Sequence, residues 1–407
     1  MEVSIASGKR ASQRKPASWQ RLALGAAALL VPCVTFATGC GSGKFFIPVC
    51  QAYNTCTSGG GGGGGGSSTN GSYAYVANYN PGTITGFAVP KTSFTNLTGT
   101  SYNLGTPPSA IAGNPKGTLL YVATAAGGVF VYVINTTNGA LALGNSSQPV
   151  TSTLNPTWMT VDPSGNWLFM VSNSSNQLLI FQINPSDGVL TQTSQGTIAL
   201  STGNPTQVYI TPNDAHVFVG LGTGGTDTFL FNASTGVVSN QLHIRPLING
   251  GSSDNTFGAD NKSAYAFIGE AGSGIRVLSI ASTGALNEIT GSPFTSNTQL
   301  GPNSIVVNST NTVVYVAYRT TNSIAGYTLG STGTLTQLAS SPFPTGSGPA
   351  QMSLDSTGSY LFVIASGGNP DLQVFKFDAA TPGKLDSVTS TATGTDPVAA
   401  ISLAVVP

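Results

Sequence analysis

One strand-rich unit recurs seven times along the chain, and this repeat limits the fold more than any other feature of the sequence. Each unit contains an aromatic residue followed by Val, Ile or Met, and successive pairs lie 46 to 49 residues apart. Four strands of about 5–6 residues with short turns fill such a unit, which is the size of one β-propeller blade. The sequence therefore predicts an all-β fold, a seven-bladed propeller of four-stranded blades. The pairs are Tyr75-Val76, Tyr121-Val122, Phe169-Met170, Phe218-Val219, Phe267-Ile268, Tyr315-Val316 and Phe362-Val363.

The third unit shows the strand pattern most clearly. Residues 156–161 are predicted as its inner strand, 167–172 as the second strand and 178–183 as the third. Residues 162–165 (Asp-Pro-Ser-Gly) form the first turn, and Asp187-Gly188 supplies the positive φ that a tight hairpin requires. The strands are too apolar to alternate cleanly, as expected for sheets that pack on both faces. Equivalent hairpins are predicted at Asn138-Gly139, Thr235-Gly236, Thr283-Gly284, Thr332-Gly333 and Pro382-Gly383.

The two ends of the repeat region complement each other. The first unit begins at its second strand, residues 73–78, and has only a glycine-rich segment before it. Residues 396–403 repeat the inner-strand pattern but have no unit of their own. Pairing this segment into blade one would close the ring and remove open strand edges. We therefore predict that the C-terminal strand completes blade one.

Residues 1–39 have the pattern of an export signal: a basic leader, then the apolar run 22–37, which is too short for a comfortable membrane span. The run ends in Ala-Thr-Gly before Cys40, which resembles a bacterial lipobox, whose cysteine carries lipid. We predict Cys40 as the lipidation site, and an ordinary secretory signal cut nearby is the alternative. Both predict that the protein leaves the cytoplasm. We expect an exported cell-envelope or outer-membrane lipoprotein on the periplasmic or extracellular side. A lipid would be the only membrane attachment.

Residues 40–70 form a predicted linker between the anchor and the propeller body, residues 71–407. Cys50 and Cys56 lie six positions apart in this linker, and a small disulfide loop is expected in an oxidising compartment. Two free thiols are the alternative, and a metal site is less favoured because no His lies near. Eight consecutive glycines, residues 59–66, then provide a flexible tether.

Three second-strand segments, residues 74–78, 120–124 and 314–317, resemble the YVTN repeat. The Pro-x-x-Ile strand and the Asp-Pro-Ser-Gly turn that precede this motif are similar to those of the lactonase-like seven-bladed propellers. The resemblance covers about residues 71–407. It implies a lactone-opening site on one face of the ring, built from His, Glu and Arg side chains. Such chemistry needs a base to activate water and cations to hold the developing oxyanion.

Glu270, Arg245 and Arg319 are the candidate catalytic residues, because they fall on adjacent blades of a chain in which only 7% of residues are charged. Glu270 ends the second strand of blade five, and Arg319 follows the equivalent position in blade six. Arg245 lies in the long connection before the inner strand of blade five. A salt bridge between blades is the alternative role. His216, on the opposite face, and His243, in the outer strand of blade five, are interpreted as polar surface residues.

Two classes of function remain. Polar uncharged loops and scarce catalytic groups favour a surface or periplasmic binding or scaffold module, whose partner at the propeller face is a small molecule, a sugar or a protein. The alternative is a lactone hydrolase resembling 6-phosphogluconolactonase. Trp158, Tyr79 and Tyr318 could stack on a flat ligand. No cofactor or metal is predicted, and the sparse Lys and Arg argue against nucleic acid.

Overall fold

The computed structural model describes residues 72–89, 99–151, 156–172, 174–247, 253–281, 283–295, 301–394 and 399–407. The predictions for the signal peptide, for Cys40 and for the pair Cys50 and Cys56 lie outside these ranges, as does the prediction of a glycine tether. Within these ranges, no helix is long and apolar enough to cross a membrane.

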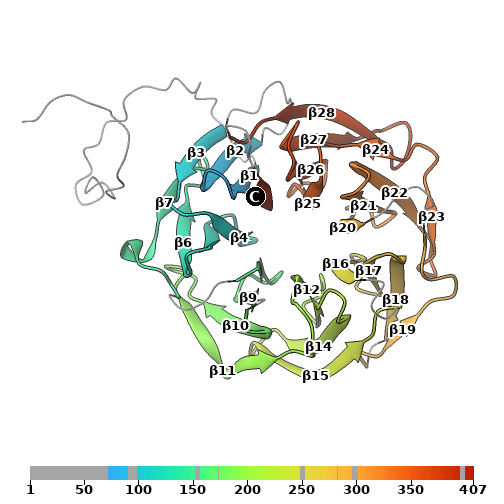
Figure 1. The fold of residues 1–407 in the computed structure, drawn as a ribbon, viewed down its shortest axis with the longest axis horizontal. Helices are drawn as coiled ribbons and strands as arrows, with labels where there is room; N and C mark the ends of the chain where they lie inside the picture. The colour runs from blue at the N-terminus through green and yellow to red at the C-terminus, as the bar shows by residue number, and fades with distance from the viewer. Residues whose placement is uncertain are drawn as a thin grey trace, which may run out of the picture. The chain divides into compact units, whose positions relative to one another are not determined.

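The described strands form seven antiparallel sheets around a central axis, which confirms the predicted seven-bladed propeller (Figure 1). Blade one contains β29 (Ala400–Val406), β1 (Ser72–Asn78), β2 (Thr83–Val89) and β3 (Gly99–Asn103). Blade two contains β4 (Pro108–Gly113), β5 (Leu119–Thr124), β6 (Val129–Ile134) and β7 (Leu141–Leu143), followed by the 3₁₀ helix η2 (Asn145–Ser147). Blade three contains β8 (Trp158–Val161), β9 (Trp167–Ser172), β10 (Gln177–Ile183) and β11 (Leu190–Ala199).

The remaining four blades repeat this order from the inside outward. Blade four contains β12 (Gln207–Ile210), β13 (His216–Gly220), β14 (Thr226–Asn232) and β15 (Val237–Ile244). Blade five contains β16 (Ser253–Ala259), β17 (Tyr265–Ala271), β18 (Gly274–Ile280) and β19 (Leu286–Glu288). Blade six contains β20 (Pro302–Val307), β21 (Val313–Tyr318), β22 (Ser323–Leu329) and β23 (Leu335–Gln337), with β24 (Phe343–Pro344) also pairing with β22. Blade seven contains β25 (Pro349–Leu354), β26 (Tyr360–Ala365), β27 (Leu372–Phe377) and β28 (Leu385–Thr391).

The C-terminal strand completes blade one, as the sequence predicted. β29 pairs antiparallel with β1, so that Tyr73 lies opposite Val406 and Ala77 lies opposite Ser402. The sheet order is β29-β1-β2-β3, and Figure 1 shows β29 beside β1 near the centre of the ring. The last strand of the chain thus gives blade one the four strands that the other blades have.

The second strands are buried because every sheet packs against a neighbouring blade on each face. β1, β5, β9, β13 and β21 are buried at every position. Between blades three and four, the rings of Phe169 and Phe231 meet edge to face with their centroids 5.0 Å apart. Burial on both faces explains why these strands read as continuous apolar runs rather than as alternating patterns.

In blades one, two and six, the hydroxyl of a second-strand tyrosine donates a hydrogen bond to the hairpin of the next blade. The Tyr75 hydroxyl donates to the carbonyl of Gly139 over 2.8 Å. Gly139 has φ of +71°, and a Cβ there would lie 2.2 Å from the ring of Tyr73, so only glycine fits this hairpin. The same bond runs from Tyr121 to Gly188 and from Tyr315 to Gly383.

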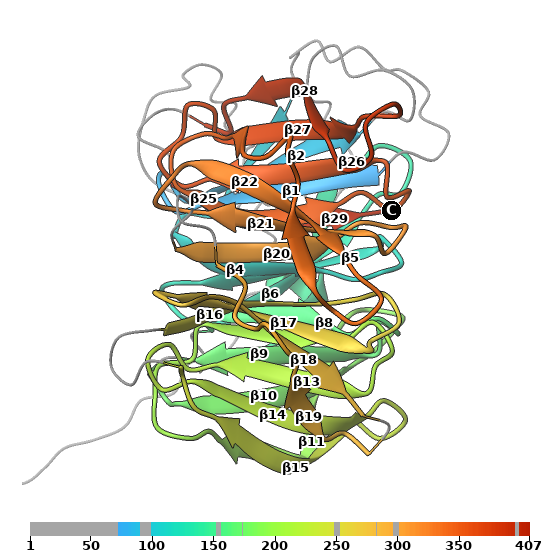
Figure 2. The same cartoon turned by 90° about the vertical axis from the view of Figure 1, so that its right-hand side faces the viewer.

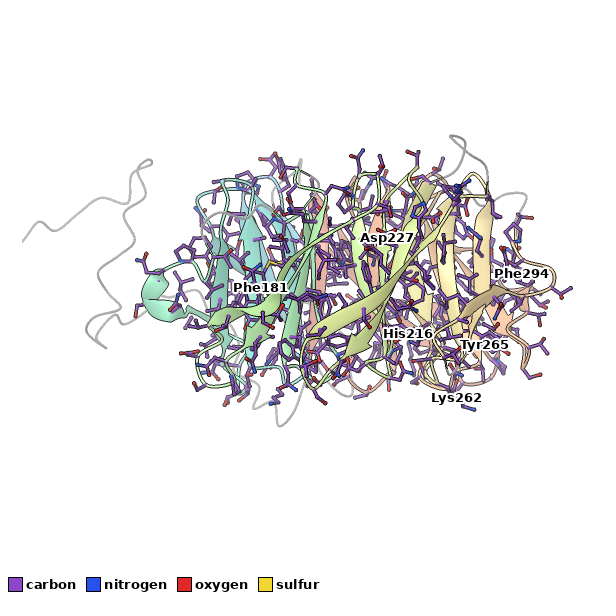
Figure 3. All side chains as sticks on the ribbon, turned by 90° about the horizontal axis from the view of Figure 1, so that it is seen from below. Phe181, His216, Asp227, Lys262, Tyr265 and Phe294 are labelled. Atoms are coloured by element: carbon purple, nitrogen blue, oxygen red, sulfur yellow. The ribbon has the colours of Figure 1, made fainter. Side chains whose placement is uncertain are left out.

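The ring has two faces, and Figure 2 shows it edge-on. We call one the loop face, because it carries the loops between second and third strands and the starts of the inner strands. The other is the hairpin face, which carries the first-to-second turns and the third-to-fourth hairpins. Asp227, near the start of β14, lies toward the loop face, whereas Lys262, in the turn after β16, lies toward the hairpin face (Figure 3).

Two interpretations of the histidines are wrong. His216 lies toward the hairpin face, as expected, but it is only 7% exposed because it begins β13 beneath the Gly284 hairpin of blade five. Burial lowers the pKa of its imidazole. His243 lies in β15, which is the outer strand of blade four rather than of blade five. His243 is exposed, as the interpretation of a surface histidine expects, and its side chain is also bonded to a buried carboxylate.

Candidate functional site

Charged side chains gather toward the loop face of blades four and five. Among the described residues, three of the five ion pairs lie there, and they join His243 to Asp227 and Arg276 to both Glu270 and Glu288. The other two involve Lys384, on the surface of blade seven. In a chain with 7% charged residues, this concentration marks the candidate site.

Glu270 is completely buried near the end of β17. Its Oε1 accepts a hydrogen bond from the backbone N–H of Leu247 over 2.6 Å. Its Oε2 lies 3.5 Å from Nη1 of Arg276. The carboxylate therefore joins the connection after β15 to the third strand of blade five, and the bulk solvent has no direct access to it in this structure.

Arg276 is the cation that reaches Glu270, and the sequence analysis did not single it out. Its Nη1 donates to the backbone carbonyl of Arg245 over 2.9 Å, and its Nη2 donates to Oε2 of Glu288 over 3.0 Å. Partial burial acts to raise the pKa of Glu288, but hydrogen bonds from Arg276 and Ser292 outweigh it and lower that pKa. An arginine inside the mostly apolar strand Gly274–Ile280 was the signal that could have identified it.

The two predicted arginines have other surroundings. Arg245 contributes its backbone carbonyl to Arg276, while its side chain is exposed. Arg319 follows β21 and donates through Nη2 to Oγ of Ser366, 3.3 Å away in blade seven. The ion pair of Glu270 with Arg276 lies within blade five, and it supports the connection from blade four through Leu247.

Asp254 is a second buried carboxylate at the boundary of blades four and five. Its Oδ2 accepts a hydrogen bond from the Thr226 hydroxyl over 2.6 Å, and its Oδ1 has no hydrogen-bond partner among the described residues. Burial raises its pKa to about 6, against the hydrogen bond from Thr226. Neither Asp254 nor Thr226 was a candidate, although an Asp in an inner strand where the other blades carry apolar or small polar residues is unusual.

Asp227 and His243 form a carboxylate–imidazole pair on the outer strands of blade four. They lie opposite each other in the pairing of β14 with β15, and His243 Nδ1 is 2.9 Å from Asp227 Oδ1. Asp227 is completely buried, and its Oδ2 accepts from the Ser201 N–H over 2.7 Å and from Gln241 Nε2 over 2.9 Å. The buried carboxylate holds the Nδ1 atom of the imidazole. The other ring nitrogen, Nε2, has no partner among the described residues.

The inner strands surround a central cavity of about 440 Å³. Its polar side chains are neutral, and several of them join neighbouring strands. Gln351 bonds both the N–H and the carbonyl of Leu403, and Ser304 accepts from the N–H of Met352. The cavity therefore offers amides, hydroxyls and Trp158 to a ligand, without a charge in its described lining.

The three aromatic residues that the sequence suggested as a stacking surface have different surroundings in the structure. Tyr79 is 50% exposed, whereas Tyr318 is buried and shares a hydrogen bond with Tyr327. Trp158 lines the central cavity. Among the residues described here, no group of three or more His, Cys, Asp or Glu could hold a metal ion.

Comparison with known proteins finds one family model that matches most of the chain. A family model described as "Lactonase, 7-bladed beta-propeller" matches residues 69–210 and 201–402. No curated protein matches the chain.

Solved structures resemble the chain over most of its length. A protein from Bacteroides fragilis, named provisionally as a 6-phosphogluconolactonase, aligns with a TM-score of 0.65 at 19% identity, covering 83% of this chain and 99% of that protein. The periplasmic gluconolactonase of Pseudomonas aeruginosa aligns with a TM-score of 0.62 at 15% identity, covering 82% of this chain and all (100%) of that protein. At such identities the likeness concerns the fold alone.

Proposed function

Because the chain belongs to the seven-bladed lactonase propeller family, we propose that it is a lactone hydrolase whose site lies on the loop face over blades four and five. The observation that supports this location is the concentration of ion pairs there, in a chain otherwise poor in charge. Hydrolysis of a cyclic ester requires a water-activating base and a positive group near the carbonyl oxygen. This region offers His243, Asp254 and Glu270 as bases and Arg245 and Arg276 as cations.

We propose a small lactone without phosphate as the substrate. A phosphate dianion is usually bound by several cations or by backbone N–H groups at a helix N-terminus. The loop face carries two exposed arginines, Arg245 and Arg319, and they lie on different blades. A neutral or singly charged sugar lactone needs only one of them.

The test is hydrolysis of a panel of γ- and δ-lactones by the purified protein, including glucono-δ-lactone with and without a 6-phosphate. We expect proton release from unphosphorylated members to be faster than the uncatalysed rate that is measured when the protein is omitted. Absence of turnover on every member would refute the proposal. Better turnover of the phosphorylated lactone would refute the substrate class alone.

A Glu270→Gln variant addresses the role that the sequence analysis gave to this residue. If Glu270 activates water, the variant should lose turnover while the protein stays folded. If Glu270 only positions Arg276 and the connection through Leu247, about tenfold loss is expected, because glutamine still accepts the backbone hydrogen bond.

The binding-module function remains the second candidate, and the central cavity is the observation that favours it. Its volume of about 440 Å³ and its uncharged lining suit a neutral sugar or polyol. Titration of neutral monosaccharides and disaccharides, followed by the fluorescence of Trp158, would measure such binding. A Trp158→Phe variant is the matched control, because it keeps the ring against the cavity and removes the indole signal.

We propose further that the protein is exported and held by lipid at Cys40. The support is the basic leader, the short apolar run and the lipobox-like segment before that cysteine. Cys40→Ala should move the protein from the membrane fraction into the soluble exported fraction. Retention in membranes would place the anchor elsewhere, for example in an uncleaved apolar run.

A further inference from the structure

We propose that His243, oriented by Asp227, is the water-activating base of this protein. The inference rests on the proposed lactone hydrolysis and assigns its central step to a residue pair that neither the family match nor the sequence candidates identify. It starts from a difference in solvent exposure among the possible bases. Glu270 and Asp254 are completely buried, whereas the His243 side chain is 34% exposed toward the loop face.

The carboxylate determines which nitrogen of His243 can act. Both oxygens of Asp227 accept hydrogen bonds, from Ser201, Gln241 and the imidazole. Nδ1 of His243 must therefore carry a proton to donate over 2.9 Å, which leaves the lone pair of the neutral ring on Nε2. A buried carboxylate that holds an imidazole in this tautomer also stabilises the imidazolium that forms when Nε2 takes a proton.

The surroundings of the pair suit a positioned base rather than a packing contact. The hydrogen bond joins residues directly opposite each other in the β14–β15 pairing, so two rigid strands set its geometry. Asp227 is anchored a third time by the backbone N–H of Ser201, from the end of blade three. A histidine that only filled space would be expected to bury its ring, as His216 does at 7% exposure.

The cation required for the carbonyl oxygen is close in sequence. Arg245 lies two residues after His243, about 7 Å along an extended chain. Its backbone is held by the hydrogen bond from Arg276, and its side chain is exposed. Arg276 itself is held by the buried Glu270 and by the partly exposed Glu288, so these two ion pairs position the segment that carries Arg245.

The reaction can be written with these groups alone. Nε2 of His243 accepts a proton from water, and the water oxygen bonds to the lactone carbonyl carbon. The carbonyl oxygen becomes negative and faces Arg245. The bond between the carbonyl carbon and the ring oxygen then breaks, the imidazolium returns its proton to that oxygen, and a hydroxy acid leaves.

The first test measures how the imidazole is presented, and it does not depend on a lactone. The chain has two histidines, so the full chain purified without a histidine tag reports on both. Diethyl pyrocarbonate acylates an accessible, unprotonated imidazole nitrogen. We expect one fast-reacting histidine, absent in His243→Gln, slower in Asp227→Asn and unchanged in His216→Leu. A parent protein with no fast-reacting histidine would overturn the inference.

The second test measures turnover of the lactone that the parent protein hydrolyses best. His243→Ala should lower kcat by about 10²- to 10⁴-fold, and added imidazole should restore part of it. Asp227→Asn should lower kcat by about tenfold or more, because its amide no longer selects the Nδ1–H tautomer. Gln192→Ala is the control, since Gln192 is exposed on β11 of blade three and makes no hydrogen bond to Asp227 or His243 in the described part of the chain, and it should stay within about threefold of the parent.

The outcomes separate this inference from the proposed function. A parent protein that opens no lactone refutes both. A parent protein that opens lactones while His243→Ala keeps its kcat refutes only the base assignment. If His243→Ala loses kcat because it does not fold, as its circular dichroism spectrum would show, imidazole cannot rescue it. The His243→Gln variant then decides the assignment. That variant must be both folded and inactive for the assignment to stand.

Discussion

The end of the second strand carries a neutral amide in blade one, where the ring closes, and a carboxylate in blade five. At the closure of the ring, Asn78 ends β1 and donates to the hydroxyls of Thr83 and Thr85 and to the carbonyl of Thr393. Its amide oxygen accepts from the Thr393 hydroxyl over 2.7 Å. In blade five, the equivalent region holds Glu270, whose neighbours are a guanidinium and a backbone N–H.

The difference lies in how the two residues and their neighbours are bonded. The amide of Asn78 uses both of its donors and its acceptor, without any charge. Beside Glu270, Nε of Arg276 and Oδ1 of Asp254 have no hydrogen-bond partner among the described residues. Buried polar groups left without partners cost stability and are retained mainly where they serve a function. Oδ1 of Asp371, whose other oxygen bonds Thr393 at the closure, also has no partner among the described residues, so what distinguishes the second region is the ion pair of Glu270 with Arg276.

The largest expected effect is on the closure itself. Deleting residues 396–407 removes β29 and leaves one edge of β1 without its seven-residue partner. We expect loss of the cooperative unfolding transition in thermal melts followed by circular dichroism, because a ring with an open edge no longer unfolds as one unit. Replacing only Pro407 by Ala is the control. A truncated protein that melts like the parent would disprove closure by this strand.

The next effect concerns the closure's hydrogen bonds. Asn78→Leu should lower the free energy of unfolding by about 4 kcal/mol, because several buried partners lose their bonds at once. Chemical denaturation would measure it. Gln192→Leu, on the exposed outer strand β11, is a control that makes the same amide-to-aliphatic change at the surface, and it should shift stability by less than about 0.5 kcal/mol. An Asn78→Leu effect no larger than that control would contradict the role given to Asn78.

A pH effect should distinguish the charged region. The pKa of Asp254 is raised to about 6 in the folded protein, so its contribution to stability is complete below about pH 4 and is lost as the pH rises through 6. Asp254→Asn does not titrate there. Relative to the parent protein, the variant should gain at most about 3 kcal/mol between pH 4 and pH 8. A stability difference that does not change with pH would show that Asp254 titrates normally.

The smallest effect should come from His216, whose pKa burial lowers. An imidazole that resists protonation when folded contributes stability above the unfolded pKa, and this is lost as the pH falls through that value. The parent protein should therefore lose stability relative to His216→Leu between pH 7.5 and pH 5. Denaturation midpoints at several pH values would measure it, and an opposite slope would mean that the folded protein protonates this ring readily.

The repeats alone were enough to predict the ring, because hairpin and strand signals are local. Gly139 and Gly188, for example, were predicted from two-residue turns, and both adopt positive φ. The site was only partly predictable. Glu270 stood out because charge is rare in the second strands, but Arg276, its partner, lies in another strand at a spacing that no motif records. His243 was misplaced by one blade because the connection after it is unusually long.

The sequence by itself determined the number of blades, the strand order within each and the closure by the last strand, since each follows from a periodic pattern of apolar residues and turns. Only the tertiary structure decided which polar groups meet. Asp227 and His243 are 16 positions apart, and their contact exists because β14 and β15 pair in one particular register. The burial that separates His243 from His216 also depends on the neighbouring blades. Charge partners and access to solvent are properties of packing, which no local pattern encodes.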